Sequence, residues 1–68
     1  PNPANNRLFV ESDVAGTIEI INSQGQVLLK DKATKGLSEY DISSFQTGIY
    51  FVILHNNQIM ITKKLLKL

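Results

Sequence analysis

Apolar and polar residues alternate along most of this chain with a period of two, which is the side-chain period of an extended strand. Near the start, Leu8 and Val10 fall on one side of an extended chain, whereas Arg7, Phe9 and Glu11 fall on the other. Clusters of Gly, Asn, Ser and Asp, which favour turns, separate such runs. The pattern predicts six strands, at residues 7–11, 17–22, 27–30, 37–42, 49–54 and 58–66.

The fifth of these segments differs from the others because it is apolar throughout. Residues 49–54 are all β-branched, aromatic or aliphatic. A run of this length and composition is typical of a strand with no polar face. We therefore expect segment 49–54 to be the central strand, covered on both faces.

Two short turns link neighbouring strands. Gly25 lies between the second and third segments and supplies the positive φ that a short hairpin loop needs. Asn56 and Asn57 precede the last segment, and Asn tolerates the positive φ of a two-residue hairpin turn. The strands flanking each turn are expected to pair antiparallel.

Short strands with regularly spaced turns and no helical periodicity predict an all-β fold, a small antiparallel immunoglobulin-like β-sandwich of six to seven short strands. A chain of 68 residues has room for one domain with a thin core. It begins with Pro1 rather than Met, and no signal peptide precedes the first strand. We therefore expect a single domain, residues 1–68, that is a fragment of a longer protein.

The composition leaves little room for catalysis, metal binding or nucleic-acid binding. With one His and no Cys, the chain has neither a disulfide nor a zinc site built from Cys and His. It also lacks the motifs of a nucleophilic Ser or a phosphate-binding loop, and its carboxylates lack the spacing of a calcium loop. A net charge of +1 provides no basic stripe for a phosphate backbone. We expect no enzyme activity, no cofactor, no metal, no catalytic residue and no nucleic-acid partner.

Segment 41–50 is the most informative part of the chain. Its short polar side chains, among them Asp41 and Ser43, can hydrogen-bond nearby backbone ahead of Gly48 and Tyr50. In immunoglobulin-like sandwiches a Tyr at the start of a late strand bonds backbone a few residues upstream and fixes the crossover loop. The sequence therefore predicts a tyrosine corner at Tyr50.

The final segment allows two interpretations. As a helix, Ile61, Leu65 and Leu68 would share one face and the lysines would lie elsewhere, as in a basic helix at a membrane surface. As a strand, the β-branched residues that follow a hairpin turn would fit, and the lysines would protect an edge. The strand is favoured, and the helix stays open as an alternative.

Three separated motifs together resemble the type IX secretion C-terminal sorting domain, a family found at the C-termini of proteins exported by Bacteroidetes. The motifs are Pro1-Asn2-Pro3 at the start, the D-x-S-x-F-x-x-G-x-Y sequence of 41–50, and the terminal apolar and Lys-rich stretch. The family pattern has Leu where this chain has Phe45, an apolar change that keeps the position buried. The resemblance spans the whole chain. Pro1, Asn2, Pro3, Asp41, Ser43 and Tyr50 form the structural part of the match.

The resemblance implies an export address. An upstream cargo, covalently linked to this domain, would cross the inner membrane, and the outer-membrane translocon and its shuttle protein would then recognise the domain. In the family a sortase-like peptidase commonly removes the domain and attaches the cargo to the cell surface, although some cargos are released. The residues carried over as the recognition set are Gly48, Lys63, Lys64, Leu65, Leu66, Lys67 and Leu68. The resulting localisation is secreted or cell surface, by way of the periplasm and outer membrane.

Other functions remain compatible with the same strands. An immunoglobulin-like accessory module, carbohydrate-binding or protective, would need a platform of exposed aromatic residues, for which Phe9 and Tyr40 are the candidates. A membrane anchor through the basic tail is a further alternative. A dimer through an exposed strand edge is also left open.

Overall fold

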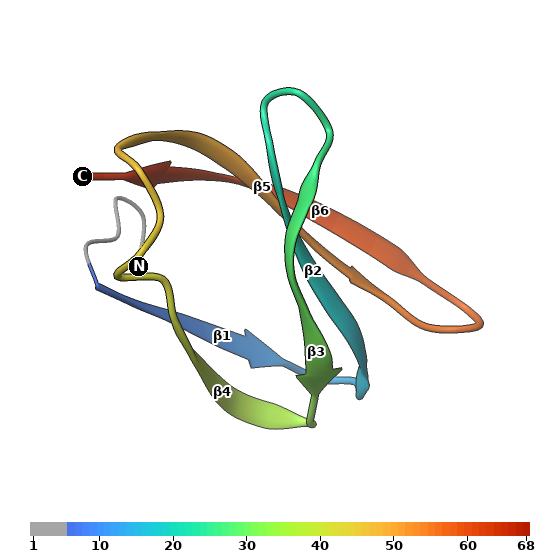
Figure 1. The fold of residues 1–68 in the computed structure, drawn as a ribbon. Coiled ribbons are helices and arrows are strands. Elements are labelled where there is room, and N and C mark those ends of the chain that lie inside the picture. Colours follow the sequence, from blue (N-terminus) through green and yellow to red (C-terminus); the bar gives the residue numbers. More distant parts are fainter. Residues whose placement is uncertain (1–5) are drawn as a thin grey trace.

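Six strands and no helix make up residues 6–68, the part of the chain that the computed structural model describes (Figure 1). No helix able to cross a membrane therefore occurs within that range. The strands are β1 (Arg7–Ser12), β2 (Gly16–Asn22), β3 (Val27–Ala33), β4 (Gly36–Asp41), β5 (Gly48–His55) and β6 (Met60–Lys67). Pro1, Asn2 and Pro3, the first of the three predicted motifs, lie outside the described residues.

The strands form two sheets. The larger sheet has the order β3-β2-β5-β6, and β1 pairs with β4 in the smaller one. Every pair is antiparallel, including the β2–β3 and β5–β6 hairpins. The predicted all-β sandwich is thus confirmed, and the C-terminal segment is a strand rather than a helix.

The core lies between the inner faces of the two sheets. The central strands of the larger sheet contribute alternate residues, with Ile18 and Ile20 fully buried in β2 and Val52 and Leu54 buried in β5. Leu8 of β1 closes the core from the smaller sheet, as the alternation predicts. The remaining buried apolar residues are Ala33, Tyr40, Ile42, Tyr50 and Leu65.

Strand β5 lies between β2 and β6, but the prediction that it is covered on both faces is wrong. Tyr50 and Val52 point into the core, whereas Ile49 is 43% exposed and Phe51 is only half-buried on the other face. The larger sheet has no layer behind it among residues 6–68, because β1 and β4 cover its inner face only. The apolar run 49–54 therefore gives β5 one buried face and one accessible apolar face.

The loop before β6 also differs from the prediction. It has four residues, 56–59, because His55 pairs with Met60. No residue other than Gly has a positive φ within residues 6–68. The Asn56 side chain shapes the loop instead, since its Oδ1 accepts hydrogen bonds from the backbone N–H of Gln58 (2.8 Å) and Ile59 (3.0 Å). In the β2–β3 loop, by contrast, Gly25 has a φ of 88° as predicted.

Tyr40 is buried rather than exposed. Its side chain points into the core, and its hydroxyl donates a hydrogen bond to the Lys32 carbonyl at 3.0 Å. This bond joins β4 to the end of β3. Strand β3 is longer than predicted, since it ends at the buried Ala33 rather than at residue 30. Phe9, 43% exposed, is therefore the one of the two predicted surface aromatics that reaches the surface.

Candidate recognition surface

The loop between β4 and β5 is held by its own polar groups. Asp41 Oδ1 accepts a hydrogen bond from the Ser43 N–H at 2.9 Å, and the Phe45 N–H donates to the Ile42 carbonyl at 3.0 Å. Hydrogen bonds from the Ser43 backbone and side chain stabilise the carboxylate and lower the pKa of Asp41 below its usual value. The first polar residues of segment 41–50 therefore define how the chain leaves β4.

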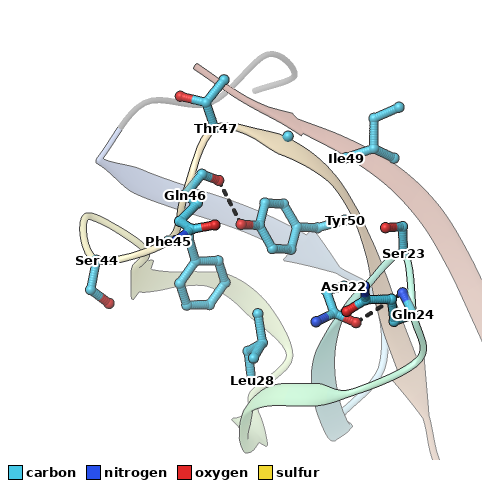
Figure 2. Close-up of a pocket in the computed structure, with 11 residues that line it drawn as sticks. Asn22, Ser23, Gln24, Leu28, Ser44, Phe45, Gln46, Thr47, Ile49 and Tyr50 are labelled. Atoms are coloured by element: carbon cyan, nitrogen blue, oxygen red, sulfur yellow. Dashed lines mark hydrogen bonds between the residues drawn. The ribbon is translucent and has the colours of Figure 1, made fainter.

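Tyr50 fixes the other end of this loop. Its hydroxyl donates a hydrogen bond to the Gln46 carbonyl at 2.5 Å, four residues upstream, and Figure 2 shows the ring extending under the loop. The Tyr50 and Phe45 ring centroids lie 5.2 Å apart, a favourable distance for an aromatic pair. This is the geometry of a tyrosine corner, and the larger Phe45 ring rests against the corner instead of disturbing it.

The β5–β6 pairing brings the loop motif next to the C-terminal segment. Gly48 lies opposite Lys67, Ile49 opposite Leu66, and Tyr50 opposite Leu65. Gly48 has a φ of 156°, which side-chain-bearing residues rarely adopt. Two motifs that are well separated in the sequence therefore form one end of the larger sheet.

The predicted recognition residues of β6 divide between its two faces. Lys63, Leu65 and Lys67 share the inner face, on which Leu65 is 2% and Lys67 is 5% exposed. Lys67 is buried along its stem, and its Nζ donates a hydrogen bond to the Leu68 carbonyl at 3.0 Å. Leu65 and Lys67 therefore support the fold, and their side chains cannot contact a partner that docks on the folded domain.

The outer face of β6 carries Lys64 and Leu66, and both are exposed. Leu66 is 39% exposed and lies beside the exposed Ile49 of β5. Phe51 lies opposite Lys64, and the next strands across the sheet add Ile21 and Val27 to the same row. We call the group Ile21, Val27, Ile49, Phe51 and Leu66 the outer strip.

Four of the five outer-strip residues were absent from the predicted recognition set. The apolar run 49–54 was the signal that could have identified Ile49 and Phe51, because a strand exposed on one face needs only alternate apolar residues to build a core. The pairing register with β2 and β3 was not visible in the sequence. Ile21 and Val27 therefore emerged only from the structure.

A cavity of about 540 Å³ lies beside the outer strip, between the β2–β3 loop and segment 44–50. Figure 2 shows Asn22 and Gln24 on one side of this cavity and Phe45 and Tyr50 on the other. The Asn22 side chain in its wall is used internally, since Oδ1 accepts hydrogen bonds from the backbone N–H of Gln24 and Gln26. This part of the cavity wall is therefore fixed by the β2–β3 loop itself.

Ionisable groups do not gather into a reactive cluster. His55 Nε2 lies 2.9 Å from Glu19 Oε1 on the outer face, and both side chains are partly buried. Within residues 6–68, no three His, Cys, Asp or Glu residues lie close enough together to hold a metal ion. The outer face of the larger sheet instead presents apolar side chains, with Lys64 beside Phe51.

Comparison with known proteins identifies a family. Residues 1–68, the whole chain, match the family described as the secretion system C-terminal sorting domain. No curated protein and no solved structure matches the chain significantly.

Proposed function

This chain belongs to the secretion system C-terminal sorting domain family, and from that membership we propose that its outer strip is the surface by which the exported protein is recognised. The family assignment makes the chain a C-terminal sorting signal for type IX secretion, which acts with the secretion machinery and an upstream cargo. Its cargo is exported across the outer membrane to the cell surface or the medium.

The observation that carries the proposal is the pairing of the two family motifs in β5 and β6. It places Ile49 beside Leu66 on an accessible face, with Lys64 in the adjoining row. An apolar strip with a cationic neighbour suits a partner surface that is apolar with an acidic border. In this arrangement Gly48, Leu65 and Lys67 act indirectly, because they hold β5 and β6 in the register that builds the strip.

Further steps follow from the family's usual course. We propose that a shuttle protein and the translocon bind the folded domain, and that a sortase-like peptidase then removes it and attaches the cargo to the surface. The domain itself acts as a ligand and carries no catalytic activity. The alternative of a carbohydrate-binding accessory module has weaker support, because the burial of Tyr40 leaves Phe9 alone as a surface aromatic from the predicted pair.

The test is export of a periplasm-targeted fluorescent protein fused ahead of the full chain, in a host with the type IX machinery. Deleting residues 63–68 would also remove the buried Leu65 and Lys67, so that loss of export could reflect unfolding. Leu66→Asp places a charge in the outer strip, and Leu37→Asp places the same charge on the exposed outer face of β4. Circular dichroism of both variants establishes that they are folded.

Leu66→Asp is expected to lower surface and medium fluorescence about tenfold, the effect of losing roughly 1.4 kcal/mol of binding free energy. Leu37→Asp is expected to be exported like the parent. Equal export of the two variants would show that the outer strip is not the recognition surface. It would not contradict the sorting function. Periplasmic retention of the folded parent fusion would contradict the sorting function itself.

A further inference from the structure

The inner face of β6 is covered along only half of its length. Leu65 and Lys67 are buried near the C-terminal end, whereas Ile61 on the same face is 41% exposed and Lys63 is exposed. Figure 1 shows the β5–β6 hairpin extending past the β1–β4 pair, which leaves this part of the larger sheet without a facing strand. An apolar inner face is thus accessible where a sandwich would normally be closed.

The neighbouring strand β1 is an edge strand. Among residues 6–68 it pairs with β4 alone, so that its second row of backbone N–H and C=O groups borders the uncovered part of β6. A groove of about 640 Å³ runs between the two strands. Its walls are mainly apolar and come from β1, β5, β6 and the adjoining loops, with Val10, Val14, Leu54, Ile59 and Ile61 among the lining residues.

We propose that this groove binds an extended segment of another polypeptide, which adds to the smaller sheet as a strand antiparallel to β1. The backbone of the added strand would pair with the outer edge of β1, and its alternate side chains would point down onto Ile61 and Val52. The function of the outer strip is not needed for this binding, because the groove lies on the opposite face of the larger sheet.

The charges along the groove indicate which charged residue the added strand should carry. Arg7 is already paired with Glu39 across β1 and β4 at 3.5 Å, whereas Glu11 and Asp13 make no ion pair within residues 6–68. Both of these carboxylates line the groove on its β1 side. The occupant is therefore a segment with apolar residues at alternate positions and a basic residue on its outward face opposite Glu11.

A single strand fits this site better than a second folded copy of the chain. Strand β6 continues beneath the open edge of β1, as the exposed Ile61 and Lys63 on its inner face show. A second sandwich brought to the same edge would place its own larger sheet against β6. An added strand without a sandwich behind it avoids that collision.

The sequence of β1 itself provides a probe. When two copies of this strand pair antiparallel with Phe9 opposite Phe9, Leu8 faces Val10 and Arg7 faces Glu11. Apolar residues then share the inner face and opposite charges meet on the outer face. A free peptide with the sequence of residues 6–13 therefore has the pattern that the groove requires.

The experiment is a titration of the isotope-labelled 68-residue chain with this peptide, followed by NMR. Binding is expected to shift the backbone amides of β1 and the methyl groups of Ile59 and Ile61. The same peptide with Asp in place of its Leu and Val residues tests the apolar contacts. Peptides methylated at alternate backbone nitrogens test the strand pairing, because one of the two sets removes the N–H groups that face β1.

Ile61→Lys is expected to weaken binding about tenfold, which corresponds to roughly 1.4 kcal/mol, whereas Leu28→Lys, an exposed change away from the groove, leaves it unchanged. The proposal is overturned if the parent peptide causes no shifts, or if the Asp-substituted peptide or both methylated peptides bind equally well. Concentration-dependent dimerisation of the chain that is abolished by Ile61→Lys would assign the groove to a second copy instead. All of these results are obtained without the secretion machinery, so that they are independent of the export test.

Discussion

The two halves of β6 have the same alternation of side chains and opposite surroundings. In the C-terminal half the inner-face residues are Leu65 and Lys67, both buried; in the N-terminal half they are Ile61 and Lys63, both accessible. A lysine is thus 5% exposed while an isoleucine of the same strand and face is 41% exposed. From hydrophobicity alone, the isoleucine would be expected to be buried and the lysine to be exposed.

The cause lies in the facing sheet. Within residues 6–68 it has two strands against four in the larger sheet, and it covers β6 only near the end where β5 begins. The long aliphatic stem of Lys67 can close that end while its ammonium group reaches the Leu68 carbonyl. The covered half therefore stabilises the domain, and the uncovered half remains available for binding.

The largest expected difference between the halves is in packing. Leu65→Ala should lower the free energy of unfolding by about 2–5 kcal/mol, because a fully buried leucine leaves a cavity. Ile61→Ala should cost at most about 1 kcal/mol, the range of β-propensity. Urea unfolding followed by circular dichroism measures both values. Equal losses would show that the groove half is packed in solution as well.

Lys67 offers a smaller test of the same comparison. Lys67→Ala removes the buried stem and should lower the free energy of unfolding by about 1–3 kcal/mol, whereas Lys67→Met keeps an unbranched stem and should cost less than about 1.5 kcal/mol. Lys63→Ala, the matched exposed change, should stay within about 0.5 kcal/mol. If Lys67→Met were as damaging as Lys67→Ala, the ammonium group rather than the stem would be the stabilising part.

Much of the fold followed from the sequence, because the alternation of residues such as Leu8, Val10, Ile18 and Ile20 depends only on the strand period. The tyrosine-corner interpretation also matched the geometry, because Tyr50 bonds backbone only four residues away. Both features depend only on residues that are close together in the sequence. They need no knowledge of how the sheets pack.

Features that depend on the second layer could not be predicted. The apolar run 49–54 fits both a strand covered on two faces and a strand with one accessible apolar face, and only the packing of the sheets distinguishes the two. Tyr40 was placed on the surface because its partner, the Lys32 carbonyl, belongs to another strand. The recognition set was drawn from one continuous segment, whereas the outer strip combines four strands. Which sheet face the second sheet covers, and which residues lie side by side on neighbouring strands, depend on tertiary structure. These two properties determine which of the predicted residues are accessible.

The smallest expected effect concerns Asp41, which lies where the smaller sheet passes into the loop at the covered end. Its pKa is below the usual value of 3.8 because Ser43 donates hydrogen bonds to the carboxylate. A lowered folded-state pKa contributes stability that is complete above the unfolded-state value and is lost as the pH falls through the folded-state value. Asp41→Asn should therefore unfold at a slightly lower urea concentration than the parent at pH 7 and at the same concentration well below pH 3.8. A parent advantage that persisted in acid would mean that Asp41 acts through its shape rather than its charge.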